Sequence, residues 1–461
     1  MADYIEDIDK FLKRLFPINR SITGDGNRET LRILQEIIPL EIKEYPSGQK
    51  VYDWTIPREW RVKDAWIKNS KGQKVIDFKD SNLHVVGYSV PVSRKIKLSE
   101  LKGYLHYLEN LPEAIPYRTT YYYETWGFCI SYNDYIKYFN DDETYEVLID
   151  SQLKDGGLSY GEFLIEGGKN SEEILISTYI CHPSMGNDNL AGLVLTALLA
   201  KELSKKTLNY NYRVIFVPET IGAIAYCCNN ETEMKKINTG FVVTTIGGPG
   251  KFGYKQSWQG DYFINKVTEE AFIKNNIDYI KYPFDIHGSD ERQYSSQGFR
   301  INTVSITKDK SYEYPYYHTS LDNLDFVKPE YIQESLHLYL CVIEKLEKSR
   351  ISDVHVQPDS ARFSSQGEVY KNLYPFCEVM LSKHGLLNGM GGSQLPVNGV
   401  IEELDIILWL LFYCDGKMSL SDISLKTGIP LDSLRYVALK LKDKCLLVKN
   451  VKKGIHCDVS S

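Results

Sequence analysis

The chain has 461 residues, of which 43% are hydrophobic, and this length suffices for two or three domains with substantial cores. Its formal net charge of −7 excludes a global electrostatic attraction to nucleic acid or to anionic membranes. The nine cysteines include no Cys-x-x-Cys pair, which is typical of reduced thiols, and no apolar run approaches the length of a membrane span. The N-terminus lacks an apolar signal core, so we expect a cytoplasmic protein without a membrane segment.

The first part of the chain predicts two helices and then a change to β structure. Residues 5–16 and 28–38 carry apolar side chains at helical spacing, on either side of a turn-rich connector. From 51 to about 145 the sequence is aromatic, β-prone and punctuated by prolines, with one helical stretch near 98–111. We therefore predict a β-rich domain, 50–154, inserted into a catalytic domain.

That catalytic domain is predicted to comprise residues 1–49 and 155–350. Its second part alternates apolar strands with helices, which is typical of an α/β fold with a mostly parallel sheet and helices on both faces. The expected strands are 174–180, 212–217, 240–246 and 301–306, and the expected helices are 190–203, 258–275 and 329–348.

The C-terminal part predicts a connection followed by a small unit. Residues 351–393 are irregular, whereas 394–461 contain two short helices around a Thr-Gly-Ile turn, preceded by a helix and followed by a strand. This order resembles a winged helix-turn-helix. The unit carries nine Lys and Arg against eight Asp and Glu, so we do not expect it to bind DNA. We expect instead a docking module, through which the chain could also form a homo-oligomer.

The strand predicted at 174–180 ends in residues that can bind a metal ion. His182 stands at the strand end and Asp188 at the start of the next helix, six positions later. Ligands bind at this end of the strands in open α/β sheets, and imidazole and carboxylate are both good zinc ligands. A second interpretation stays open here, in which His182 is structural and Asp188 caps the helix.

Further polar residues follow other strands. Glu219 ends the strand 212–217, where a carboxylate beside a metal can act as a general base. The polar cluster 287–292 precedes a strand, and His318 follows aromatic residues ahead of a helix. Each alone is compatible with a helix cap or a surface loop. Together they deliver His, Asp, Glu and His to one edge of the sheet, as expected of a metal hydrolase.

Long motifs then link the chain to a known family. It resembles the aminopeptidase-like proteins of uncharacterised function that are related to the zinc-dependent aminopeptidases. This resemblance implies a phosphorylase/hydrolase-like three-layer α/β/α domain, an inserted β-rich domain and a C-terminal winged helix-turn-helix. The motifs that carry it are 20–26, 53–54 with 57–60, 126–129, 181–183 with 187–189, 288–292, and 317–320 with 322–323.

The resemblance also implies the roles of four residues. His182, Asp188 and His318 match metal-binding positions of those aminopeptidases, and Glu219 matches their general base. Such a site acts on a small peptide or another small molecule with an amide bond.

Three positions depart from the family pattern. Thr220 and Thr244 stand where the superfamily has metal-binding carboxylates, and Ser184 stands where a carboxylate orients the first His. The remaining ligands leave an open fourth position, so one zinc ion fits this set better than two.

Substrate contacts are expected from side chains that could hold a carbonyl or carboxylate or form an aromatic wall. For each candidate, core packing or a solvated salt bridge is an equally open interpretation. The candidates are Arg20, Arg118, Trp126, Asp290, Arg292, Tyr294 and Tyr317.

Two classes of function remain open from the sequence. The first is a zinc hydrolase of amide bonds, most simply an aminopeptidase, or else an amidase or deacylase on a modified sugar, because relatives are associated with polysaccharide biosynthesis. The second is a ligand-binding or regulatory protein with a degenerate peptidase site. Retention of His182, Asp188, Glu219 and His318 favours the enzyme, whereas loss of two ligands keeps the second class open.

Overall fold

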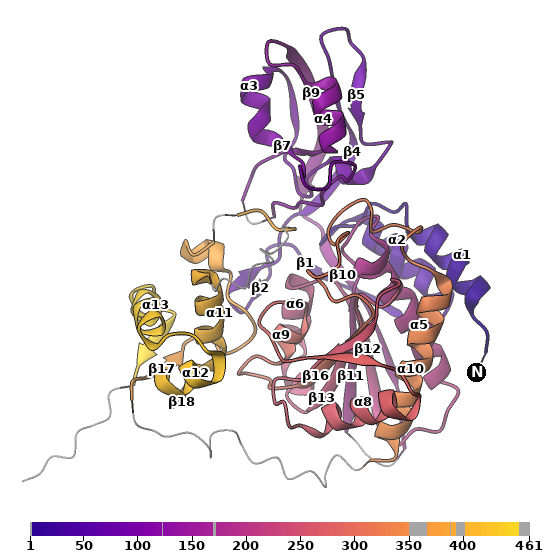
Figure 1. The fold of residues 1–461 in the computed structure, drawn as a ribbon, viewed down its shortest axis with the longest axis vertical. Coiled ribbons are helices and arrows are strands. Elements are labelled where there is room, and N and C mark those ends of the chain that lie inside the picture. The colour runs from indigo at the N-terminus through magenta and orange to yellow at the C-terminus, as the bar shows by residue number, and fades with distance from the viewer. Residues whose placement is uncertain are drawn as a thin grey trace, which may run out of the picture.

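The computed structural model describes residues 2–121, 123–168, 172–349, 367–387, 389–392 and 402–450. An eight-stranded mixed sheet forms the centre of the largest domain, in the order β1-β10-β12-β11-β13-β16-β14-β15 (Figure 1). The four central strands, β12, β11, β13 and β16, are mutually parallel. Their carboxyl ends therefore share one edge, where the polar residues of the loops gather.

The strands of this sheet are β1 (Glu41–Pro46), β10 (Gly157–Ile165), β11 (Glu173–Tyr179), β12 (Asn211–Val217), β13 (Thr239–Val242), β14 (Phe252–Lys255), β15 (Tyr279–Tyr282) and β16 (Asn302–Thr307). The helices of this domain are α1 (Ile5–Leu15), α2 (Asp25–Leu34), α5 (Ala191–Leu203), α6 (Ile221–Asn229), α7 (Glu231–Met234), α8 (Phe263–Lys274), α9 (Glu291–Tyr294) and α10 (Pro329–Glu347).

Helices cover both faces of the sheet because each face carries its own apolar cluster. On one face α1, α5, α8 and α10 pack together over the core, and α5 is buried on nearly every side. A helix that is apolar all round is expected at such a central place. On the other face α6 packs into a second cluster that continues into the inserted domain. The two clusters hold the strand ends rigidly between them.

The segment between β1 and β10 forms the inserted domain, drawn above the main sheet in Figure 1. Its four-stranded sheet has the order β5-β4-β9-β6 and is antiparallel throughout. The strands and helices of this segment are β2 (Lys50–Val51), β3 (Trp54–Thr55), β4 (Glu59–Lys68), β5 (Lys74–Asp77), β6 (Val92–Lys97), α3 (Leu98–Leu101), β7 (Leu105–His106), β8 (Phe128–Cys129), α4 (Tyr132–Tyr138) and β9 (Thr144–Lys154), with 3-10 turns at Asn82–His84 and Lys102–Tyr104.

The helix expected near 98–111 is wrong over most of its length. Only α3 is α-helical, and after a 3-10 turn the chain becomes β7, which pairs with β8. Gly103 weakens the helix, and the tertiary pairing of Leu105 and His106 outweighs the local helical pattern.

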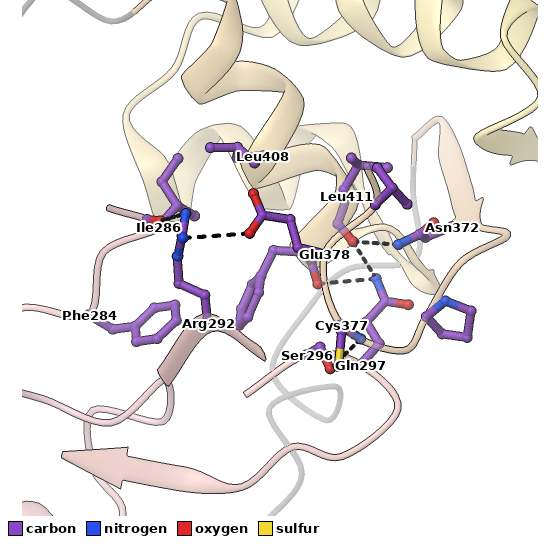
Figure 2. A pocket seen from close by; sticks show the side chains of 13 residues that line it. Phe284, Ile286, Arg292, Ser296, Gln297, Asn372, Cys377, Glu378, Leu408 and Leu411 are labelled. Carbon is purple, nitrogen blue, oxygen red and sulfur yellow. Dashed lines mark hydrogen bonds and ion pairs between the residues drawn. The ribbon is translucent and has the colours of Figure 1, made fainter. Parts of the chain in front are cut away.

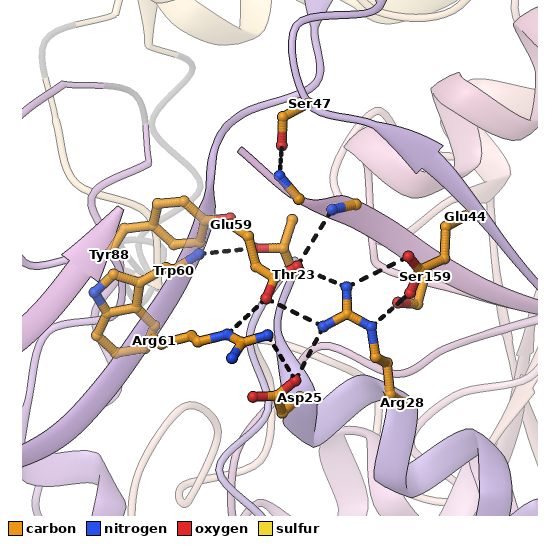
Figure 3. Close-up of polar contacts among 12 residues, drawn as sticks. Thr23, Asp25, Arg28, Glu44, Ser47, Glu59, Trp60, Arg61, Tyr88 and Ser159 are labelled. Atoms are coloured by element: carbon orange, nitrogen blue, oxygen red, sulfur yellow. Dashed lines mark hydrogen bonds and ion pairs between the residues drawn. The ribbon is translucent and has the colours of Figure 1, made fainter. Parts of the chain in front are cut away.

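A buried carboxylate joins the inserted domain to the main domain. Glu59 of β4 accepts hydrogen bonds from Arg28 of α2 at 2.6 Å, from Arg61 at 2.7 Å and from the Gly157 backbone at 3.2 Å (Figure 3). Burial opposes the ionisation of Glu59, but these donors outweigh it and lower its pKa to about 2. The Glu59 carboxylate thus holds β4 of the inserted domain against α2 and the start of β10 in the main domain.

Replacing Glu59 with Gln is expected to lower the free energy of unfolding by about 2–3 kcal/mol, because it removes a buried ion-pair partner. Because the pKa of Glu59 is lowered, its ionised form stabilises the fold at pH values above 4.5, the ordinary pKa of a glutamate side chain. This stabilisation is lost as the pH falls from 4.5 towards about 2. Thermal unfolding across this pH range should therefore depend less on pH in the variant. Asp25→Asn, at a carboxylate 64% exposed in the same network, is the control and should change stability little. Equal midpoints for the Glu59 variant and wild type would contradict this assignment.

The C-terminal unit contains a three-stranded sheet and three helices and lies beside the main domain (Figure 1). Its apolar cluster includes the buried residues Leu434, Val437, Ala438 and Leu441. They pack against the helix at residues 403–413, as the sequence predicts. Its elements are β17 (Val369–Asn372), a 3-10 turn (Leu381–His384), α11 (Glu403–Tyr413), β18 (Asp415–Ser419), α12 (Leu420–Thr427), α13 (Leu431–Asp443) and β19 (Leu447–Lys449).

The expected boundary at residue 394 places β17 in the connecting segment, and the structure corrects this. β17 is the middle strand of the C-terminal sheet, between β18 and β19. Four residues are too few to show a strand pattern, and the partners of β17 lie more than 40 residues further along the chain.

We predict that the C-terminal unit does not bind duplex DNA at submicromolar concentration. Arg435 of α13 pairs with Glu368 at 2.8 Å, and Lys440 pairs with Glu403, so these cations are already neutralised. Nonspecific DNA binding needs a clustered basic face that releases counterions. Fluorescence anisotropy with random duplex DNA at low salt measures this. Tight binding that weakens steeply with added salt would show a DNA-binding face.

None of the helices in the described ranges is both long enough and apolar enough to cross a membrane.

Candidate metal centre and active site

Three buried side chains converge at the carboxyl edge of the sheet. His182 follows β11, Asp188 lies in the irregular turn Gly186–Leu190 before α5, and His318 lies in the loop before α10. One ligand atom from each lies within 4.8 Å of the other two. His318 Nε2 is 3.1 Å from Asp188 Oδ2. This is the donor set and spacing of a divalent metal site.

The protonation states of the three side chains suit a metal ion. Burial lowers the pKa of His182 to about 4, so the ring is neutral at pH 7. Burial opposes ionisation of Asp188, yet His182 and His318 lower its pKa to about 2. Among the described residues, Asp188 Oδ2 and His318 Nε2 are buried without a well-formed hydrogen bond. A cation between them would satisfy both atoms.

A second layer of side chains fixes Asp188. The Tyr179 hydroxyl donates to Asp188 Oδ1. The carboxylate of Asp322 accepts the backbone N–H groups of Asn187 and Asp188, at 2.6 and 2.9 Å, and the Tyr314 hydroxyl at 2.9 Å. Such supporting groups hold metal ligands in their binding geometry.

Glu219 lies next to this cluster, at the end of β12. Its Oε2 is 3.7 Å from His182 Nε2. Burial, together with the charge of Asp188, raises the pKa of Glu219 to about 7. Asp290 fixes the following residue, because its Oδ1 accepts the Thr220 backbone N–H at 2.7 Å. A carboxylate with this placement and this pKa can exchange protons near neutral pH.

The three departures from the family pattern each have a different role in the structure. Thr244 Oγ1 lies 2.7 Å from the Tyr179 hydroxyl, so it takes part in the support of Asp188. Ser184 donates to the Phe16 carbonyl at 2.8 Å, away from the His182 ring. His182 Nδ1 instead lies 3.4 Å from Cys181 Sγ.

Backbone strain gathers around the site. Ser184, Thr220, Thr245, Tyr312 and His318 all have φ between 41° and 68°, in the left-handed region that branched and bulky side chains rarely adopt. Such outliers persist where the surrounding structure imposes them, and they are typical of functional sites.

Two candidate substrate contacts, Arg20 and Tyr294, form hydrogen bonds within the protein. Arg20 is buried, and it donates to the carbonyls of His182 at 2.8 Å and Leu15 at 2.6 Å. Tyr294 is buried in the core, and its hydroxyl lies 2.7 Å from Ser177 Oγ. Arg20 therefore positions the loop of His182 through Nε, whereas its buried Nη2 has no hydrogen-bond partner among the described residues; Tyr294 packs against the sheet.

The other candidates lie in different surroundings. Tyr317 stacks on His318 with ring centroids 3.8 Å apart. Trp126 stacks on Tyr104 within the inserted domain, at 4.0 Å. Arg118 lies near His106, since it lowers the pKa of that ring after the larger effect of burial.

Arg292 is fixed by the C-terminal unit. Its Nη2 is 3.6 Å from Glu378 Oε2, and its Nε donates to the Ser289 carbonyl at 3.2 Å. Figure 2 shows this pair at the junction of the two domains, where Gln297 also donates to the Leu411 carbonyl at 3.1 Å. The C-terminal unit thus supports the loop that carries Asp290 and Arg292.

Several residues at the site were missed from the sequence. Tyr117, from the segment 107–127 between β7 and β8, has its ring centroid 5.2 Å from that of His182, and its N–H donates to the His318 carbonyl. Tyr312 has its ring 4.6 Å from that of Tyr317. Glu378 reaches the site through Arg292. The runs of tyrosine at 117–123 and 312–317 were the available signal, but tyrosines are frequent throughout this chain.

Residues 9–349 match the family described as "Domain of unknown function (DUF4910)", and residues 368–449 match a winged helix-turn-helix family. The chain belongs to the DUF4910 family. It is 43% identical over 433 residues, 94% of each chain, to a Clostridium acetobutylicum protein named "Putative polysaccharide biosynthesis protein with aminopeptidase-like domain".

Solved structures share the fold. The crystal structure of a "putative peptidase" from Clostridium acetobutylicum is 42% identical, with 96% of each chain covered and a TM-score of 0.71. A zinc aminopeptidase from Bacillus subtilis is 13% identical, with 76% of this chain and 96% of that chain covered and a TM-score of 0.55. This member of the DUF4910 family therefore has the aminopeptidase α/β fold with a C-terminal winged helix-turn-helix, as the sequence predicts.

Proposed function

We propose that this protein is a metal-dependent hydrolase of amide bonds, with one zinc ion held by His182, Asp188 and His318 and with Glu219 as general base. The convergence of three buried side chains that can bind a metal ion, beside a carboxylate with a raised pKa, carries the proposal. The relatives named for peptidase or aminopeptidase-like domains support the reaction class.

The residues have distinct tasks in this reaction. When bound, zinc supplies Lewis-acid activation of water and of the amide carbonyl. Glu219 accepts the proton of the attacking water and delivers it to the leaving amine, which requires a pKa near the working pH. Arg20 and Asp322 hold the backbone of the ligand loop, and the ring of Tyr317 holds His318 in place.

One zinc ion is favoured over two by the chemistry of the neighbouring positions. Thr220 and Thr244 offer neutral hydroxyls where a second ion needs carboxylates to balance its charge. Thr244 is already engaged with Tyr179.

The test combines metal analysis with hydrolysis assays. The purified full-length chain should contain about one zinc ion per chain, and it should hydrolyse N-terminal aminoacyl amides in a reaction that a chelator abolishes. N-acylated amino sugars belong in the same panel, because the name of the 43% identical relative favours an amidase on a modified sugar as a second candidate.

A metal-free protein without activity on either class would overturn the proposal and favour a ligand-binding or regulatory role. In that case the C-terminal unit would be the place to seek a partner or a second copy of the chain.

A further inference from the structure

A cavity of about 410 Å³ adjoins the proposed metal centre. Two of its lining residues also contact the site. Thr244 lies beside Tyr179, which binds Asp188, and Tyr312 packs on Tyr317, which stacks on His318. The volume is within the range of small-molecule pockets, on the order of 300–1,000 Å³.

Both lysines that line this cavity are paired with carboxylates that also line it. Lys255 lies 2.8 Å from Glu291, and Lys310 lies 2.6 Å from Glu313. His287 lies 2.8 Å from Asp405 of the C-terminal unit. A charged substrate group would have to compete with these pairs, at a cost in desolvation. The cavity is therefore suited to a group without negative charge, because both lining lysines are already paired and Asp285 adds a further carboxylate.

One wall offers hydrogen-bonding groups that nothing in the described part of the chain uses. Strand β16 turns Val304 and Ile306 towards the core, and Thr303, Ser305 and Thr307 towards the opposite face. Ser305 and Thr307 line the cavity and are more than nine-tenths buried, and their hydroxyls have no hydrogen-bond partner among the described residues. Buried hydroxyls without partners are costly and call for a ligand or water.

We propose that this cavity binds a neutral, polyhydroxylated group of the substrate, such as a sugar ring. Its hydroxyls would exchange hydrogen bonds with Ser305 and Thr307, and Asp285 offers a further acceptor. The rings of Tyr282 and Tyr312 give the apolar faces on which such a ring packs. This inference rests on the proposed function in one respect, since the amide of the bound molecule would then lie towards Glu219.

Binding is measured by ligand-observed NMR titration on the full-length protein, with methyl N-acetyl-β-D-glucosaminide as the neutral polyhydroxylated probe. N-acetylglutamate and N-acetylleucine amide are the anionic and apolar comparison probes. We expect saturable binding of the glucosaminide, stronger than that of the other two. Because the lining includes none of the three metal ligands, a chelator should leave this binding unchanged even if the hydrolase proposal fails.

The double variant Ser305→Ala/Thr307→Val should bind the glucosaminide about tenfold more weakly, since it loses two hydrogen bonds. Thr303→Val is the matched control, because its hydroxyl is buried and unpartnered on the same face of β16 but lies outside the cavity lining. It should bind as wild type does, and neither variant should melt below wild type, because each loses only hydroxyls without a hydrogen-bond partner among the described residues.

Three results would overturn the inference: no glucosaminide binding by wild type, preference for either comparison probe, or equal binding by the double variant. If the double variant does not fold, each single variant is titrated instead, and wild-type affinity in both would have the same meaning.

Discussion

His182→Ala and Asp188→Ala proteins are expected to lose their zinc, to less than about a tenth of the wild-type content, because each removes one of only three protein ligands. Both residues lie in loops after β11, so the sheet and its two apolar clusters remain intact. Far-ultraviolet circular dichroism should therefore match wild type, while metal analysis by mass spectrometry shows the loss.

Ser184→Ala is the matched control for these two variants. Ser184 lies two positions from His182, but its hydroxyl binds the Phe16 carbonyl and not the His182 ring. The control should keep its zinc and show only a small loss of stability. Equal zinc content in all four proteins, wild type included, would show that the metal lies elsewhere.

The sequence predicts the strand-end part of the site well, for a physical reason. The parallel strands β11 and β12 are apolar runs with abrupt ends, so His182 and Glu219 can be placed at one edge from local pattern alone. No strand immediately precedes His318, so the sequence singles it out only as a His that follows aromatic residues and precedes a helix, and the family resemblance adds its role as a ligand. The structure brings all of these together with Asp188.

What the sequence does not predict comes from contacts between distant segments. Tyr117 reaches His182 from the inserted domain, and Glu378 reaches Arg292 from the C-terminal unit. No local pattern encodes such domain docking. Likewise β14 and β15 are short strands of four residues each, with β15 at the edge of the sheet, and their pairing is decided by their neighbours.

Arg20 and Tyr294 show that the type of a residue does not by itself predict what its side chain contacts. Both have the chemistry of a substrate contact, yet both turn inward, Arg20 to the His182 carbonyl and Tyr294 to Ser177. Residue type gives the capacity of a side chain for hydrogen bonding, whereas its partner is set by the packing of the whole domain.

Glu219→Gln is expected to keep zinc at the wild-type level and to lower kcat by about 10³-fold, because the amide is nearly isosteric but cannot accept a proton. The comparison with His182→Ala separates the loss of metal from the loss of activity. His182→Ala should lose both metal and activity, whereas Glu219→Gln should lose activity alone, with little change in KM.

The opposite pattern would reassign the residue. If Glu219→Gln loses zinc and regains full activity when zinc is added back, Glu219 is a fourth ligand, which its distance of 3.7 Å from His182 Nε2 permits. Full activity with zinc retained would instead exclude any role in proton transfer. Thr220 offers only a hydroxyl, so it cannot replace the Glu219 carboxylate as base. The variant therefore decides whether this carboxylate acts on water or on the metal.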